Sequence, residues 1–321
     1  MELVARKSLQ LFSGTSNPEL AQEVAECMGV ELGEANLRRF ANGEVHCRFD
    51  SSVRGCDVFI MQSHGKGVDG AVMEQLVMID AARRASAKRI TAVCPYYGYS
   101  RQDRKAEGRE PITARLLADL LITAGADRVV AVDLHSGQIQ GFFDRPVDHL
   151  TAMPVLLNYL YREANEDIVI VAPDAGRVKV AERFSQYLRT DLAFVHKRHI
   201  SGEANAVEAH GMVGSVVGRR CVIIDDMIDT AGTIVAAARL VLEAGATDVW
   251  AMATHALLSD PATERLSAST ISRVVVTNTL LLDWDKRIDK IEVLSVGNVI
   301  ADALTAVFKD TSVSGIFNGR N

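Results

Sequence analysis

The chain has 321 residues, of which 48% are hydrophobic, and a formal net charge of -6. This length suits two ordinary domains with a sizeable core, and the negative charge argues against general nucleic-acid binding. The five cysteines form no Cys-x-x-Cys pair, so disulfide scaffolding and structural zinc are not expected. No apolar run has the length of a signal peptide or a membrane span. We therefore expect a soluble, cytoplasmic protein without nucleic-acid or membrane partners.

The first half of the chain alternates apolar runs with helical patterns. We expect strands at 8–13, 57–62, 90–94 and 128–133, and helices at 17–28, 112–124 and 152–162. Asn42-Gly43 is a tight-turn signal between strand-like flanks. Gly65 to Gly70 fits Gly-x-Gly-x-x-Gly, but the next strand ends in Cys94-Pro95 without the acid of a dinucleotide site. An ordinary loop is the better interpretation.

Residues 95–111 form a long stretch without periodicity that is rich in arginine, lysine and tyrosine. Loops of this length in compact domains are usually functional or disordered. Arginine binds phosphate through two hydrogen bonds, and Tyr96, Tyr97 and Tyr99 offer aromatic faces for stacking on a base. A solvated charged loop is the alternative, and we favour function.

A second polar segment follows the strand at 128–133. Asp133 and His135 stand where that strand ends, and Asp144 and Asp148 lie downstream. A single histidine is often a hydrogen-bonded core residue. Its place at the carboxyl end of a strand, where open α/β sheets bind ligands, favours a functional role.

The second half repeats the alternation. Strands are expected at 168–171, 192–195, 222–224, 249–254, 274–277 and 291–294, with a flexible stretch at 201–205 and a last helix at 297–308. Residues 129–137 look like a degraded counterpart of 222–232. The pattern predicts two similar α/β domains, each with a mostly parallel central sheet flanked by helices, at 1–149 and 150–321.

The stretch 221–233 is the most informative in the chain. An apolar run ends at Asp225 and Asp226, Thr230, Gly232 and Thr233 follow, and a helical pattern begins at residue 234. Backbone N–H groups at a helix start favour an anion. Carboxylates beside a phosphate make sense if they face sugar hydroxyls or a magnesium ion. A sugar phosphate fits both parts of the stretch, with its phosphate at the helix start and its hydroxyls on the acids. The alternative is an ordinary turn in which Asp229 or Thr230 caps the helix.

This stretch resembles the phosphoribosyl pyrophosphate signature of phosphoribosyltransferases. The resemblance implies that Asp225 and Asp226 contact ribose hydroxyls. It also implies that the turn wraps the 5-phosphate through Asp229, Thr230, Ala231, Gly232 and Thr233.

Three segments together resemble one family over nearly the whole chain, the ribose-phosphate diphosphokinases. They are Tyr-Ser-Arg-Gln-Asp-Arg-Lys at 99–105, the segment 133–148, and Asp-Asp-Met-Ile-Asp-Thr at 225–230. The resemblance implies transfer of the pyrophosphoryl group of ATP to the C1 hydroxyl of ribose 5-phosphate. The C-terminal domain would then carry the ribose 5-phosphate motif, and the N-terminal domain the ATP loop.

The resemblance also implies site residues. ATP would contact Phe40, Asn42, Gly43, Glu44, Arg101, Gln102 and His135. His135, Asp174 and Asp133 would hold Mg²⁺, and Lys197 would be catalytic. Asp144 and Asp148 belong to the signature without an assigned role. The resemblance further implies a homo-oligomer, a hexamer in this family. A site near Ser312 and Ser314 would bind phosphate or ADP as effectors between subunits.

The chain departs from the family at two places. Lys197-Arg198-His199 stands where Lys-x-Arg is usual, so either Arg198 or His199 takes the place of the arginine on ribose 5-phosphate. Arg177 stands where many members have glycine. Two other functions stay open: a phosphoribosyltransferase, which would not need the second domain or the 99–105 loop, and a non-catalytic regulator associated with a synthetase.

Overall fold

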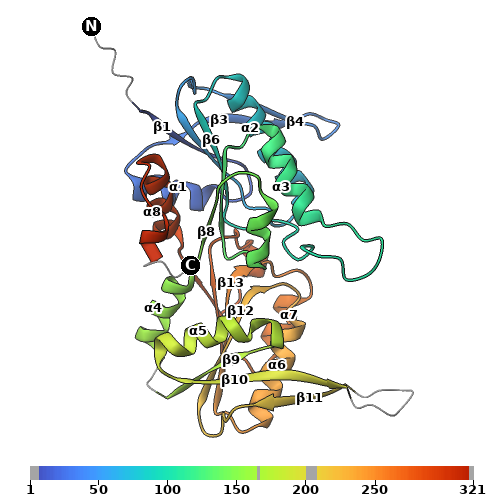
Figure 1. Ribbon diagram of the computed structural model, residues 1–321. Coiled ribbons are helices and arrows are strands. Elements are labelled where there is room, and N and C mark those ends of the chain that lie inside the picture. The colour runs from blue at the N-terminus through green and yellow to red at the C-terminus, as the bar shows by residue number, and fades with distance from the viewer. Residues whose placement is uncertain (1–6, 165–166, 200–207, 318–321) are drawn as a thin grey trace. The chain divides into compact units, whose positions relative to one another are not determined.

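A computed structural model of the chain describes residues 7–164, 167–199 and 208–317, without the side chains of 197–199 and 208–210. The chain forms two compact units (Figure 1). Unit 1 comprises residues up to Thr151, Thr279–Leu281, and the segment from Ser295 onward; unit 2 comprises Ala152–Asn278 and Leu282–Leu294. None of the helices in the described ranges combines the length and apolar character needed to cross a bilayer.

Unit 1 contains a six-stranded, all-parallel sheet in the order β2-β1-β5-β6-β7-β8, and a separate antiparallel ribbon, β3-β4. Its elements are β1 (Leu9–Ser13), α1 (Pro18–Met28), β2 (Leu32–Gly33), β3 (Ala35–Arg39), β4 (Val45–Phe49), β5 (Asp57–Met61), α2 (Val68–Arg84), β6 (Arg89–Cys94), α3 (Thr113–Ala124), β7 (Arg128–Val132), η1 (Gly137–Phe142), β8 (Val147–Leu150), α8 (Gly297–Phe308) and η4 (Ser314–Phe317).

Unit 2 contains a seven-stranded sheet in the order β11-β10-β9-β12-β13-β14-β15, in which only the edge pair β10-β11 is antiparallel. Its elements are α4 (Met153–Glu163), β9 (Ile168–Ala172), η2 (Ala175–Arg177), α5 (Val178–Leu188), β10 (Asp191–His199), β11 (Glu208–Val213), β12 (Arg220–Ile228), α6 (Gly232–Glu243), β13 (Asp248–Ala256), α7 (Ala262–Ala268), β14 (Arg273–Thr277), η3 (Trp284–Lys286) and β15 (Ile291–Leu294).

The core of unit 2 explains why the sequences of its strands are unbroken apolar runs. Along β9, Val169 and Val171 pack with α6 and α7, whereas Ile170 and Ala172 pack with α4 and α5. Successive side chains of a strand point to opposite faces, so a sheet covered by helices on both sides needs apolar residues at every position. The predicted α/β architecture with two mostly parallel, helix-flanked sheets is confirmed.

The compact units differ from the predicted domains in the C-terminal half, where Thr279–Leu281 also belongs to unit 1. The first long segment ends at Thr151, near the predicted boundary, but the C-terminal segment from Ser295 belongs to unit 1, although 150–321 was predicted to form one domain. Helix α8 lies beside α1 of unit 1 (Figure 1). Its buried residues, among them Ile300, Leu304 and Val307, need an apolar partner, and the sequence does not reveal which one.

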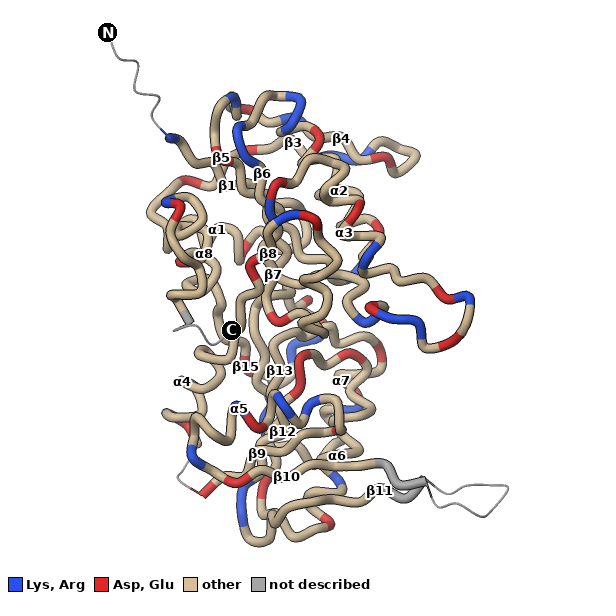
Figure 2. Tube along the Cα trace, in the orientation of Figure 1, with Lys and Arg blue, Asp and Glu red and all other residues tan. Residues whose placement is uncertain are grey.

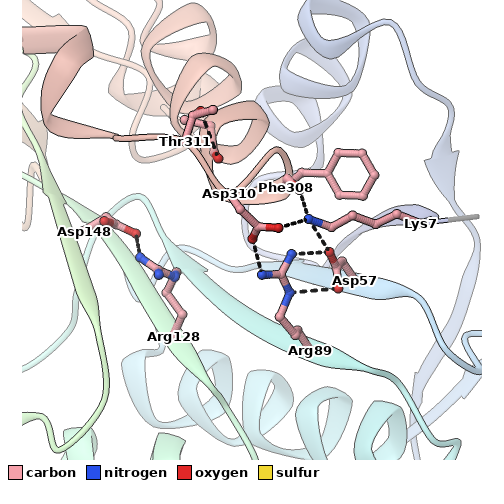
Figure 3. Close-up of polar contacts among 9 residues, drawn as sticks. Lys7, Asp57, Arg89, Arg128, Asp148, Phe308, Asp310 and Thr311 are labelled. Atoms are coloured by element: carbon pink, nitrogen blue, oxygen red, sulfur yellow. Dashed lines mark hydrogen bonds and ion pairs between the residues drawn. The ribbon is translucent and has the colours of Figure 1, made fainter.

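Charged side chains fix the end of the C-terminal helix in unit 1 (Figure 3). Asp310, just after α8, lies 2.6 Å from Lys7 Nζ and 2.6 Å from an Arg89 guanidinium nitrogen. Arg89 also donates to the buried carboxylate of Asp57, with Nε 2.9 Å from Oδ1. Nearby, Arg128 pairs with Asp148. The cluster gathers residues that open β5, β6 and β7, so it lies at the amino end of the sheet, away from the ligand edge expected for parallel strands.

The sheet orders correct one further expectation. By position, β1, β2, β5, β6, β7 and β8 of unit 1 correspond to β9, β10, β12, β13, β14 and β15 of unit 2. The counterpart of β12 is therefore β5, and the loop 62–67 corresponds to the turn after β12. The predicted correspondence of 129–137 with 222–232 is wrong, because β7 occupies the position of β14.

Candidate active site

The acid pair of unit 2 lies within β12. Asp225 and Asp226 were expected where this strand ends, but pairing with β13 continues through Met227 and Ile228, which face His255 and Ala256. The acids therefore sit on a hydrogen-bonded backbone at the carboxyl edge of the sheet. Asp226 is buried, and the side chain of Asp225 is 14% exposed. A rigid strand holds both carboxylates in fixed directions.

The buried pair has an altered acidity. Burial, then the charge of Asp226 and a hydrogen bond with it, raise the pKa of Asp225 well above its usual range, and the Arg177 guanidinium opposes this change. The backbone N–H of Asp226 donates to Asp225 Oδ1 at 2.8 Å. The pair therefore retains a proton more readily than two isolated carboxylates do.

The turn after β12 has the form of an anion site. Helix α6 begins at Gly232, and its N-cap is Ala231, at φ 60° and ψ 4°, in the left-handed region. The alternative interpretation, a helix cap by Asp229 or Thr230, is wrong, because Ala231 occupies the cap position and has no side-chain acceptor for the first N–H groups of the helix. Thr230, Gly232 and Thr233 are exposed. Free N–H groups at a helix start and exposed hydroxyls suit a phosphate.

Two arginines that the sequence did not assign lie at this site. Arg177 Nε is 3.0 Å from Asp225 Oδ1, and its Nη2 is 2.7 Å from Asp226 Oδ1. Arg265, on α7, donates to the Thr230 carbonyl at 3.0 Å. Both contacts join segments far apart in the chain, so no local sequence pattern signals them; Arg177 stood out only as a departure from the family.

Asp174 belongs to the same edge of the unit 2 sheet. It follows β9, the neighbour of β12, and its Oδ1 accepts from the backbone N–H groups of Gly176 at 2.8 Å and Arg177 at 3.2 Å. The predicted catalytic Lys197 and the predicted ribose 5-phosphate ligand His199 belong to β10, which is longer than the predicted strand at 192–195. Their side chains, and the stretch 201–205, lie outside the described part of the chain.

The remaining predicted ligands belong to unit 1. Asp133 and His135 follow β7 and are partly buried, and Asp133 has a positive φ of 38°. Asp148 pairs with Arg128, and Asp144 lies 3.7 Å from Arg115. The predicted metal group of Asp133, His135 and Asp174 thus divides between the two units. Among the described residues, no three histidine, cysteine or acidic side chains come together in a group that could hold a metal.

The tip of the β3-β4 ribbon forms the predicted tight turn. Gly43 N–H donates to the Phe40 carbonyl at 2.8 Å, Gly43 has φ 91°, and Asn42 Oδ1 accepts from Glu44 N–H at 3.2 Å. Phe40 is 47% exposed, with the Arg38 guanidinium over its ring at 5.4 Å. An exposed ring on a rigid turn is available to stack on a base.

The loop between β6 and α3 carries charges of both signs (Figure 2). Its residues from Arg101 to Ile112 are exposed, except the half-buried Asp103. Gln102 is held at the start of α3, where its carbonyl accepts from Ala114 N–H at 3.2 Å and its side chain accepts from Thr113 Oγ1 at 2.5 Å. The expectation that all three tyrosines offer stacking faces is wrong for Tyr96 and Tyr97. Both are buried, and the Tyr97 hydroxyl donates to the Ala114 carbonyl.

Comparisons with known proteins give the family. Residues 9–125 match the family model described as the N-terminal domain of ribose phosphate pyrophosphokinase, and residues 209–318 match the phosphoribosyl synthetase-associated domain. A ribose-phosphate pyrophosphokinase of Streptomyces coelicolor is 51% identical over 99% of this chain and 98% of its own length. One from Bacillus subtilis is 49% identical over 97% of this chain and 98% of its own.

A solved structure is similar over almost all of both chains. The phosphoribosylpyrophosphate synthetase of Mycobacterium smegmatis has a TM-score of 0.90 and 51% identity, covering 95% of this chain and 100% of that one. Similarity that spans both units does not fit a phosphoribosyltransferase, which would need only one. The resemblance drawn from the three segments is confirmed, and the chain belongs to the ribose-phosphate pyrophosphokinases, a family of enzymes.

Proposed function

We propose that the chain transfers the pyrophosphoryl group of ATP to the C1 hydroxyl of ribose 5-phosphate, giving phosphoribosyl pyrophosphate and AMP for nucleotide biosynthesis. The observation that carries the proposal is the arrangement after β12, an acid pair followed by a helix start without a side-chain cap, in a chain similar over its length to enzymes of that name. The five cysteines form no disulfide, which supports the reducing cytoplasm as the location of the enzyme.

Ribose 5-phosphate binds to unit 2 in this proposal. The 5-phosphate accepts hydrogen bonds from the turn 229–233 and the first N–H groups of α6, where the helix dipole also favours an anion. Arg265 adds a positive charge beside Thr230. Asp225 and Asp226 accept hydrogen bonds from the ribose hydroxyls. His199 or Arg198 completes the site from β10.

ATP binds through residues of unit 1. Phe40 stacks on the adenine, with Asn42, Gly43 and Glu44 fixing the turn that carries it, and Arg101, Gln102 and His135 contact the base or the phosphates. The support is the exposed ring on a hydrogen-bonded turn and the Gln102 contacts that fix the loop. Arginine and backbone-fixed polar groups are suited to phosphate recognition.

We infer that Mg²⁺ accompanies ATP. Magnesium at nucleotide sites takes one or two carboxylates together with phosphate oxygens, so it does not require a complete protein cage. Asp133 and Asp174 each stand at the carboxyl end of a parallel strand and supply such carboxylates, with His135 beside Asp133. When bound, the ion would offset the negative charge of the phosphates.

The reaction requires the protein mainly to position the two substrates and to stabilise charge on the reacting phosphates. The C1 hydroxyl oxygen forms a bond to the β-phosphorus and releases its proton to water. The bond from that phosphorus to the oxygen bridging to the α-phosphate breaks, so AMP leaves with that oxygen. Fixed carboxylates orient the ribose, the turn fixes its other end, and Lys197 stabilises charge that develops on the reacting phosphates.

Phosphorus NMR of the purified chain with ATP, ribose 5-phosphate and Mg²⁺ tests the reaction. We expect AMP and phosphoribosyl pyrophosphate in equal amounts. ADP with a phosphorylated sugar would mean that the γ-phosphorus is attacked, and it would overturn the proposal. Absence of turnover together with ATP binding would support the non-catalytic regulator instead.

We further propose regulation by phosphate or ADP in a homo-oligomer, a hexamer by family resemblance. A cavity of about 550 Å³ in unit 1 is lined by Arg128, Gln140, His149, Thr311, Ser312 and Ser314, among others. Hydroxyls and an arginine suit a phosphate group. Sedimentation analysis gives the oligomeric state. Initial rates with added phosphate or ADP should change in the native chain and not in Ser312→Ala/Ser314→Ala.

A further inference from the structure

Arg177 binds both carboxylates of the acid pair. Its Nε and Nη2 lie 3.0 and 2.7 Å from Oδ1 of Asp225 and Oδ1 of Asp226, respectively. The three side chains are 13%, 14% and 8% exposed, so water screens their interaction weakly. Arginine presents two nitrogens in a fixed plane, and one guanidinium can therefore hold two acceptors at once.

The backbone that carries Arg177 is held by a third acid. Asp174 Oδ1 accepts from the backbone N–H of Arg177 at 3.2 Å and from that of Gly176 at 2.8 Å, which closes the short η2 turn. A side chain at Gly176 would begin 3.1 Å from that oxygen, closer than ordinary contact. Asp174, which follows β9, thus fixes the backbone of Arg177, and the acid pair of β12 fixes its guanidinium group.

The charges of the two acids and of Arg177 affect the binding of ribose 5-phosphate, which is itself negatively charged. Two carboxylates side by side in a partly buried strand repel each other and a phosphorylated sugar. A divalent cation brought with the ligand could balance them, or a fixed protein cation could. Arg177 already contacts Oδ1 of both acids, so a protein cation lies at the pair.

We propose that Arg177 is a positioning residue that fixes the two carboxylates and balances their charge, so that ribose 5-phosphate binds to unit 2 without a divalent cation. The inference rests on the proposed function, because it concerns the ribose 5-phosphate site. It assigns a role to the residue by which the chain departs from many relatives.

Calorimetric titration of ribose 5-phosphate into the full chain without ATP tests the inference, once with Mg²⁺ and once with EDTA. Native affinity should be the same in both within about threefold. Arg177→Met, which keeps the length but not the charge, should weaken binding in EDTA by about tenfold or more, and Mg²⁺ should restore part of it. Arg177→Lys should lie between, because an ammonium group cannot span both acids in one plane.

Arg239→Met is the matched control. Arg239 pairs on the surface of α6 with Glu243 and its side chain is 80% exposed, so its loss should leave affinity unchanged. A merely structural role for Arg177 would affect both substrates alike. We expect the KM for ATP to stay within about twofold in Arg177→Met while the KM for ribose 5-phosphate rises.

Two results would overturn the inference: native binding that disappears in EDTA, or Arg177→Met that binds in EDTA as the native chain does. If Arg177→Met does not fold, Arg177→Lys decides, and native affinity in that variant would contradict the role. Native binding of the sugar phosphate without formation of phosphoribosyl pyrophosphate would contradict the proposed function alone.

Discussion

The conformation of Ala231 shapes the turn between β12 and α6, which we propose to bind the phosphate. At φ 60° it adopts a left-handed conformation that costs an ordinary residue roughly 1–2 kcal/mol. Alanine tolerates this conformation, whereas β-branched residues are genuine outliers there. The strain lies at the residue where strand β12 and its turn give way to α6, as is common at ligand sites.

Substitution of Ala231 tests that turn. Ala231→Val should raise the KM for ribose 5-phosphate by about tenfold or more, because valine would push the backbone out of the left-handed region. Ala231→Gly, which adopts it freely, should stay within about threefold of the native value. Steady-state kinetics compares them, and equal KM values for the two variants would contradict the importance of the left-handed cap.

The raised pKa of Asp225 has a consequence for stability. A carboxyl group whose pKa is higher in the folded chain than in the unfolded chain leaves the folded state with more bound protons between those two values. The free energy of unfolding contributed by Asp225 is therefore present at low pH. It is lost as pH rises from its ordinary value through the raised one.

Asp225→Asn should remove this contribution, because asparagine does not titrate. We expect the variant to gain stability relative to the native chain as pH rises from about 5 to about 8. Urea unfolding curves of both chains at several pH values measure the difference. A difference that stays constant over this range would show that Asp225 titrates as an exposed carboxyl does.

At the residue scale, the sequence pattern marks the segment proposed to bind ribose 5-phosphate, but not all the residues that contact it. Asp225, Asp226 and the turn 229–233 are adjacent in the chain, so their pattern is visible there. Arg265 meets Thr230 across 35 positions, and Arg177 reaches the acids from another strand's end. Such pairs depend on which strands are neighbours, and the sequence does not state that.

At the scale of elements, strand and helix positions followed from periodicity, and strand ends did not. Helix α1 and helix α8 begin or end close to where the pattern predicts. Strand β12 continues past the acids because β13 offers a partner as far as Ala256, and β10 continues because β11 pairs with it. Partner length, a tertiary property, decides where a strand ends.

The loop after β6 shows how a buried element can position an exposed one. His64 is buried; its Nδ1 accepts from Gly98 N–H at 3.2 Å, and its Nε2 lies 2.8 Å from Gln75 Oε1. Burial lowers the pKa of His64 to about 4, so the ring is neutral in neutral solution. A neutral ring can accept at one nitrogen and donate at the other.

Loss of this ring should loosen the start of the loop that carries Arg101 and Gln102. We expect His64→Ala to raise the KM for ATP by about fivefold or more, since the Gly98 N–H loses its acceptor, and to leave the KM for ribose 5-phosphate nearly unchanged. Kinetics with each substrate varied in turn measures both. Equal increases in the two KM values would contradict an effect confined to the ATP loop.

At the scale of the whole molecule, the two units exchange their last helices. In unit 1 the strand β8 is followed by α4, which belongs to unit 2, and in unit 2 the strand β15 is followed by α8, which belongs to unit 1. The repeated βα pattern predicted two similar units. The pattern could not predict that α4 and α8 belong to the other unit, because the apolar face of a helix does not specify the surface on which it packs.

The ionic cluster that binds the end of α8 to unit 1 should matter for stability (Figure 3). Arg89→Met would leave the carboxylate of Asp57, only 3% exposed, with Lys7 at 3.7 Å as a weaker partner. We expect a loss of about 2 kcal/mol in the free energy of unfolding. Calorimetry measures it against Arg84→Met, an exposed pair with Asp80 that should leave the midpoint unchanged. Similar midpoints for both variants would contradict a stabilising cluster.

A crystal structure with ribose 5-phosphate bound will show whether the acid pair and the turn after β12 hold the sugar phosphate. We expect the 5-phosphate on the backbone N–H groups of Gly232 and Thr233. We expect the ribose hydroxyls on Asp225 and Asp226, with Arg177 still bound to both acids. A sugar phosphate held elsewhere, or turned so that its phosphate lies away from α6, would contradict it.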